Sequence, residues 1–157
     1  MIFLDCATLT MNNLIKNLLP IDEKIIVCEE NLKKVRLTTN NKKFYKIHLD
    51  NDDLVPNKQM RCDYIIVCED LRNIAIWIEL KGSDIARACN QIKASIEKYG
   101  TNVKNKYAVI VFSSKTSPKT NTHFQRFQKK FRKNLFYKSD LVEIKYDRNL
   151  DKIVQTN

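Results

Sequence analysis

Residues 61–82 read RCDYIIVCEDLRNIAIWIELKG and give the clearest structural signal in the chain. They contain two runs of β-branched and other apolar residues, 61–68 and 74–81, which are separated only by the polar segment 69–73. Such runs are typical of central strands that are covered on both faces of a sheet. Because the connection between them is short, the two strands are predicted to form an antiparallel hairpin.

The segments around this hairpin alternate between helical and strand-like patterns. Apolar residues recur at helical spacing between Ile85 and Tyr99 and are followed by Gly100, which predicts a helix that ends there. Further strands are predicted at 24–28, 43–50, 107–112 and 141–146, and further helices at 8–19 and 119–133. Residues 29–38 are ambiguous and could open a helical turn. This order predicts an α/β fold, a single domain over 1–157 with a mixed β-sheet flanked by helices.

The charge of the chain is concentrated near its C-terminus. The chain has 28 Lys and Arg and 18 Asp and Glu residues, a formal charge of +10, and no acid occurs between residues 101 and 139. A basic block of this kind favours a nucleic-acid partner, although it is equally consistent with a solvated surface. Six residues are candidates for contacts to a nucleic-acid backbone: Lys115, Lys119, Arg126, Lys129, Lys130 and Arg132.

The cysteines and the N-terminus indicate a cytoplasmic protein. The five cysteines include no C-x-x-C pair, and the first residues do not resemble a secretion signal, so free thiols in a reducing compartment are expected. No apolar run approaches the ~18–20 residues of a membrane helix, which argues against a membrane partner.

The hairpin also carries the residues that point to chemistry. Glu79 and Lys81 are two positions apart, so both side chains should emerge on one face of their strand. Asp63 begins the preceding antiparallel strand, so it should lie beside Glu79. Two neighbouring carboxylates repel each other unless a cation binds between them, and Mg²⁺ with oxygen ligands suits this site. The alternative is that Glu79 and Lys81 are polar strand-end residues that meet solvent.

These motifs, Arg61-Cys62-Asp63-Tyr64 and Ile78-Glu79-Leu80-Lys81-Gly82, resemble those of the PD-(D/E)xK nuclease superfamily. The resemblance implies a restriction-endonuclease-like α-β-β-β-α-β core over about residues 8–115, followed by a basic C-terminal extension over 115–157. It implies that Asp63, Glu79 and the backbone carbonyl of Leu80 ligate Mg²⁺, with Mn²⁺ as a substitute. It also implies that Lys81 orients or activates the attacking water. One departure is Cys62, which stands where the family often has proline.

Two further catalytic candidates come from the same resemblance. Some members place a glutamine on the helix after the motif, which corresponds to Gln91, and the alternative for this residue is solvent exposure. Some members use an additional acid from the N-terminal segment, which corresponds to Glu30.

The sequence therefore predicts a divalent-metal-dependent endonuclease, a hydrolase that cleaves phosphodiester bonds, with DNA as the expected substrate. The alternative from another class is a non-catalytic nucleic-acid-binding or assembly module that keeps the nuclease-like fold. A homodimer, or a place as a subunit of a larger complex, is compatible with either function.

Overall fold

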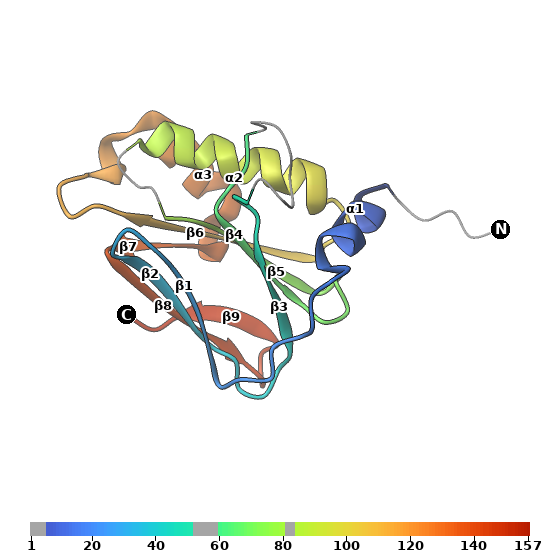
Figure 1. The fold of residues 1–157 in the computed structure, drawn as a ribbon. Helices are drawn as coiled ribbons and strands as arrows, with labels where there is room; N and C mark the ends of the chain where they lie inside the picture. The colour runs from blue at the N-terminus through green and yellow to red at the C-terminus, as the bar shows by residue number, and fades with distance from the viewer. Residues whose placement is uncertain (1–5, 52–59, 81–83) are drawn as a thin grey trace.

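The computed structural model of this chain describes residues 6–51, 60–80 and 84–157 (Figure 1). Its helices are α1 (Cys6–Ile15), α2 (Ile85–Tyr99) and α3 (Thr122–Phe131), with short 3₁₀ turns η1 (Pro118–Thr120) and η2 (Arg132–Asn134). Its strands are β1 (Ile25–Glu30), β2 (Lys33–Thr38), β3 (Phe44–His48), β4 (Tyr64–Cys68), β5 (Ile74–Glu79), β6 (Asn105–Phe112), β7 (Leu135–Ser139), β8 (Leu141–Asp147) and β9 (Lys152–Gln155).

The strands form two mixed sheets. The larger sheet has the order β3-β4-β5-β6-β7, in which β4 and β5 form the predicted antiparallel hairpin and β5, β6 and β7 run parallel. The smaller sheet has the order β1-β2-β8-β9, in which β2 and β8 are parallel neighbours. The α/β prediction is confirmed, and the second sheet is a feature that the sequence patterns did not reveal.

The two sheets and the helices form three layers. Figure 1 shows α2 and α3 over one face of the larger sheet and the smaller sheet against its other face. One apolar core joins Trp77 and Ile65 of the larger sheet to Ile92 and Phe124 of the helices. A second core lies between the sheets and is built from alternate residues of the same central strands. This double coverage explains why β4 and β5 are buried at every position and are apolar apart from Glu79 at the end of β5.

Helix α2 is fixed at both ends by hydrogen bonds. The Asp84 carboxylate accepts a hydrogen bond from the backbone N–H of Arg87, and the N–H of Gly100 donates to the carbonyl of Ile96. A side chain at Gly100 would collide with the Trp77 ring, because a Cβ there would lie 2.5 Å from Cζ2. Within the described residues, no helix combines the length and the apolar character needed to cross a bilayer.

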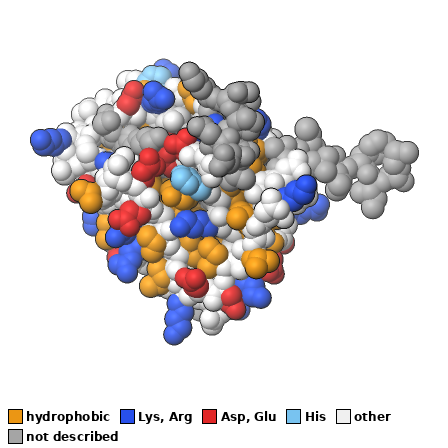
Figure 2. Space-filling view, in the orientation of Figure 1, with side chains coloured by type: hydrophobic (Ala, Val, Ile, Leu, Met, Phe, Trp, Pro, Cys, Tyr) orange, Lys and Arg blue, Asp and Glu red, His pale blue; other side chains and the backbone are white. Residues whose placement is uncertain are grey.

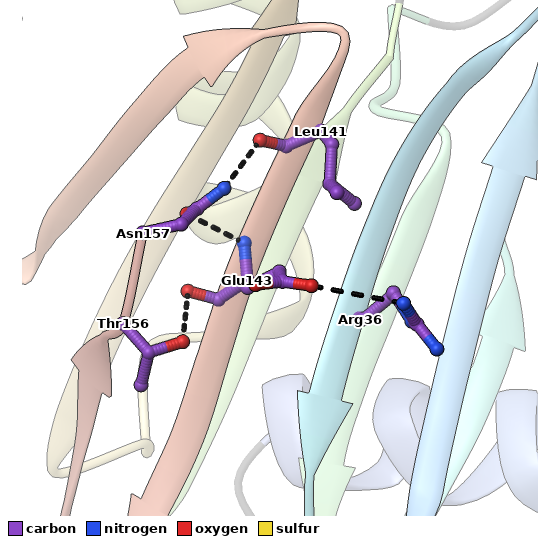
Figure 3. A network of polar contacts seen from close by, with 5 residues as sticks. All are labelled: Arg36, Leu141, Glu143, Thr156 and Asn157. Carbon is purple, nitrogen blue, oxygen red and sulfur yellow. Dashed lines mark hydrogen bonds and ion pairs between the residues drawn. The ribbon is translucent and has the colours of Figure 1, made fainter.

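The segment 115–157, predicted as an extension, forms part of both sheets and of the helical layer. It supplies α3 and β7 to the layers around the larger sheet and β8 and β9 to the smaller sheet. Beyond β9, the Asn157 side chain continues the pairing with β8: its amide nitrogen donates to the Leu141 carbonyl at 2.9 Å and its oxygen accepts from the Glu143 N–H at 2.9 Å (Figure 3). The Glu143 carboxylate lies 3.7 Å from Arg36 of β2, so β8, which holds the last residues, is also tied to β2 (Figure 3).

Candidate functional site

Both the backbone and the side chain of Asp63 are hydrogen-bonded to the motif Ile78-Glu79-Leu80-Lys81-Gly82. Its backbone N–H donates to the Ile78 carbonyl at 3.0 Å, which extends the β4–β5 pairing by one residue. Its Oδ2 accepts a hydrogen bond of 2.7 Å from the backbone N–H of Leu80. Asp63 is only 1% exposed. The carboxylate of the first motif is therefore fixed at the residue between Glu79 and Lys81.

Glu79 is the last residue of β5 and is fully buried. Tyr64 pairs with Ile78, so continuing the register by one residue places Glu79 opposite Asp63, as the sequence predicts. Side chains alternate along a strand, so Glu79 shares the face of Trp77, which packs under the helices. A buried carboxylate is costly unless it is compensated, which makes Glu79 a candidate functional residue. Lys81 lies outside the described residues.

Three carboxylates converge next to this motif. One oxygen each of Glu30, Asp50 and Asp63 lies within 4.8 Å of the other two. Glu30 ends β1, Asp50 follows β3 and Asp63 precedes β4, so the group combines the smaller sheet with the edge of the larger one. Figure 2 shows acidic side chains gathered beside a histidine near the middle of the viewed face. We call these three residues the acidic group.

Backbone contacts explain why the acidic group forms. The N–H groups of Leu49 and Asp50 both donate to the Asp63 carbonyl, at 2.9 and 3.2 Å, which brings the end of β3 to the start of β4. The Lys46 ammonium donates to the carbonyl of Val27 at 2.6 Å and so ties β3 to β1. Backbone pairing of β3 with β4, together with this side-chain contact to β1, therefore brings together acids that are 13 to 33 residues apart in the sequence.

The surroundings of the acidic group are partly basic and partly aromatic. Arg61 Nε lies 3.4 Å from Asp50 Oδ1 and offsets part of the negative charge. The Tyr64 ring stacks on His48, with centroids 4.6 Å apart. Burial raises the pKa of the Tyr64 hydroxyl, and the charges of Glu30 and Asp63 add to this effect. Mg²⁺ and Mn²⁺ favour carboxylate oxygen ligands, so the residues present fit a hard divalent cation.

Helix α2 supports the chain that leads into Asp63. The backbone N–H of Cys62 donates to Ser95 Oγ at 2.9 Å, and that hydroxyl donates in turn to the Gln91 carbonyl at 2.9 Å. Gln91 is half-buried, and it enters this arrangement through its backbone, so a catalytic role for its side chain stays a prediction. Burial raises the pKa of the Cys62 thiol, against the lowering effect of Ser95, and the thiol is therefore neutral.

The six predicted phosphate-contacting residues are all exposed but are distributed over several elements. Lys115 precedes η1, Lys119 lies in η1, and Arg132 lies in η2, whereas Arg126, Lys129 and Lys130 belong to α3. Of these six, Arg126 and Lys130 line one pocket, together with residues of α2. The other four residues lie outside the lining of this pocket, and a role for the set in phosphate contact stays a prediction.

Sequence reasoning did not single out Asp50 and treated Glu30 as a secondary candidate. Asp50 could have been found by the logic that paired Asp63 with Glu79, because it ends a strand-like run beside the start of the next one. Glu30 had no such signal, because its position depends on how a second sheet packs. Among the described residues, the convergent metal-ligand group contains Glu30, Asp50 and Asp63 and does not include Glu79.

No protein-family model, curated protein or solved structure matches this chain. Function is therefore inferred from the residues themselves.

Proposed function

We propose that this chain is a divalent-metal-dependent nuclease that hydrolyses phosphodiester bonds in DNA. The observation that carries the proposal is the position of Asp63, whose carboxylate is hydrogen-bonded to Leu80 within the Glu79–Lys81 motif and also belongs to the acidic group. A carboxylate that is fixed by a backbone donor and grouped with two other acids is suited to holding a cation in a defined position.

In this proposal Asp63 is the central metal ligand. Glu30 and Asp50 would supply further oxygen ligands, and the motif resemblance adds Glu79 and the Leu80 carbonyl as expected ligands. Mg²⁺ held by these residues would supply positive charge that stabilises the negative charge developing on the phosphate oxygens, and it would lower the pKa of a bound water. Lys81 is proposed to orient the water that attacks the phosphate. Arg61, 3.4 Å from Asp50, would offset part of the negative charge of the acidic group.

The second candidate function is a non-catalytic nucleic-acid-binding module. It is favoured by the exposed basic residues of α3 and the turns around it, because exposed Lys and Arg side chains can contact a phosphate backbone without any chemistry. Both functions predict salt-dependent binding of nucleic acid, and only the nuclease also predicts cleavage that needs the acidic group.

The two functions are separated by a cleavage assay on the full chain. Supercoiled, linear, branched and single-stranded DNA, with RNA alongside, are incubated with Mg²⁺ or Mn²⁺, and EDTA serves as the metal-free control. The nuclease predicts products only with metal, and their loss in an Asp63→Asn variant that still binds DNA. Salt-dependent binding without cleavage of any substrate under either metal would reject the nuclease and support the binding module.

A further inference from the structure

A basic pocket lies between helices α2 and α3, which cover the larger sheet. It has a volume of about 90 Å³. Its charged and polar lining consists of Asn90 and Lys93 from α2 and His123, Arg126 and Lys130 from α3. We call it the α2–α3 pocket.

Helical spacing explains why these residues meet. His123, Arg126 and Lys130 follow one another at three- and four-residue intervals, which places them along one face of α3. Phe127 lies on the same face and is only 2% exposed, so it anchors the helix against the core while its charged neighbours remain at the surface. Lys93 and Cys89 are four residues apart on α2 and face this stripe.

The pocket concentrates positive charge without neutralising it. No acid is found among the described residues that line it, and none of the three ion pairs that join described residues includes Lys93, Arg126 or Lys130. Lys130 has one other contact, over the Phe131 ring at 6.0 Å from the centroid. Like charges four residues apart, as in Arg126 and Lys130, disfavour a helix, and a bound anion removes this penalty.

The buried thiol in the pocket does not offset this charge. Burial raises the pKa of Cys89 to about 11, against the lowering effect of the nearby Lys93 charge. The Cys89 thiol is therefore uncharged at physiological pH and lines the pocket as a neutral group. The Asn90 side chain and the His123 ring add hydrogen-bond donors beside the cations.

The size of the pocket limits what it can hold. Its volume of about 90 Å³ has room for a few water molecules. A single phosphate group fits such a space, whereas pockets that enclose a whole small molecule usually have about 300–1,000 Å³. Arg and Lys together are the side chains that proteins most often use for phosphate recognition.

We propose that the α2–α3 pocket binds one phosphate group. This inference does not rest on the acidic group, and it holds whether or not the chain cleaves its ligand. Two sources share this chemistry, the backbone of a nucleic acid and a free phosphate-bearing molecule, and the experiment below distinguishes them.

The test compares two double variants of the full chain with equal loss of charge. Lys93→Gln with Arg126→Gln removes two cations of the pocket. Lys16→Gln with Lys24→Gln is the matched control, because both of these lysines are exposed and belong neither to the pocket lining nor to the predicted phosphate contacts. Circular dichroism and thermal unfolding establish that both proteins fold like the wild type.

Each protein is titrated with a fluorescent DNA duplex in EDTA, which prevents cleavage, and separately with inorganic phosphate by calorimetry. A backbone site predicts about tenfold weaker duplex binding for the pocket variant and a salt slope reduced by about one for each lost contact, measured between about 50 and 200 mM salt. Phosphate binding that is lost in the pocket variant, with unchanged duplex affinity, assigns the site to a free phosphate-bearing ligand. Equal behaviour of the pocket and control variants toward both probes overturns the proposal.

Discussion

The acidic group and the α2–α3 pocket carry opposite charges and are built in opposite ways. The acidic group collects side chains from strand ends of two sheets, and Asp63 at its centre is fixed by hydrogen bonds and only 1% exposed. The pocket collects exposed side chains from neighbouring turns of two helices. Buried groups with fixed partners lose more on substitution than exposed, flexible ones. The acidic group should therefore be sensitive to single substitutions, and the pocket should tolerate them with graded effects.

The largest effect is expected for Asp63→Asn. The amide keeps the shape of the side chain and can still accept a hydrogen bond from Leu80, but it removes the charge at the centre of the acidic group. We expect DNA cleavage to fall by at least about a hundredfold, with the fold retained. Single-turnover cleavage and circular dichroism measure the two properties. Glu97→Gln, which neutralises an exposed acid of α2, is the control, and wild-type cleavage by Asp63→Asn contradicts the role of the acidic group.

A smaller effect, on metal affinity, is expected for Glu30→Gln. This variant keeps the size of the side chain but removes one of the three converging carboxylates, so Mn²⁺ affinity should fall by at least about tenfold in calorimetry. Its neighbour Glu29 is exposed, lies 3.6 Å from Lys34 and does not belong to the acidic group, so Glu29→Gln is a matched control. Equal Mn²⁺ affinity of the Glu30→Gln and Glu29→Gln variants would contradict a ligand role for Glu30. If Glu79→Gln then lost Mn²⁺ affinity, the metal site would consist of Asp63 and Glu79.

Asp63 and Glu30 also differ in how far their positions could be predicted from the sequence. The β4–β5 hairpin follows from two apolar runs and a short turn, and the hairpin alone places Asp63 next to Glu79 and Leu80. Local patterns of this kind determine local neighbours. Helix α2 could be predicted from the sequence equally well, because its apolar face and the glycine that follows it are strong signals.

The second sheet could not be predicted in the same way. Its β1–β2 hairpin turns through Asn31 and Leu32, both with positive φ, and a leucine in that conformation is unusual where glycine is the common signal. The strand β2 then pairs in parallel with β8, so that Val35 meets Val142, a partner more than a hundred residues away. Glu30 reaches the acidic group only through this packing, so no local pattern could assign it.

A moderate effect on stability is expected for Ser95→Ala. Helix α2 contacts both regions: Ser95 holds the Cys62 N–H before Asp63, and Lys93 lines the pocket. Removing the hydroxyl leaves a buried N–H without its acceptor, which should lower the free energy of unfolding by about 1–3 kcal/mol in urea titrations. Ser114→Ala, at an exposed position, should change it by less than about 0.5 kcal/mol. Phosphate binding by Ser95→Ala should equal that of the wild type, and a parallel loss would mean that the two regions are coupled.

The smallest effect is expected for Arg61→Gln, which should strengthen Mn²⁺ binding where the other substitutions weaken binding, cleavage or stability. Arg61 lies 3.4 Å from Asp50, so its positive charge partly neutralises the acidic group and would compete with the proposed metal ion for the same carboxylate. A partly exposed ion pair contributes at most about 1 kcal/mol, so removing the cation should tighten Mn²⁺ binding by up to about fivefold. Arg72→Gln, at an exposed position in the β4–β5 turn, controls for the change in net charge. Weaker Mn²⁺ binding by Arg61→Gln than by this control would show that Arg61 positions Asp50 for the metal, and the basic and acidic features of the molecule would then be cooperating within one site.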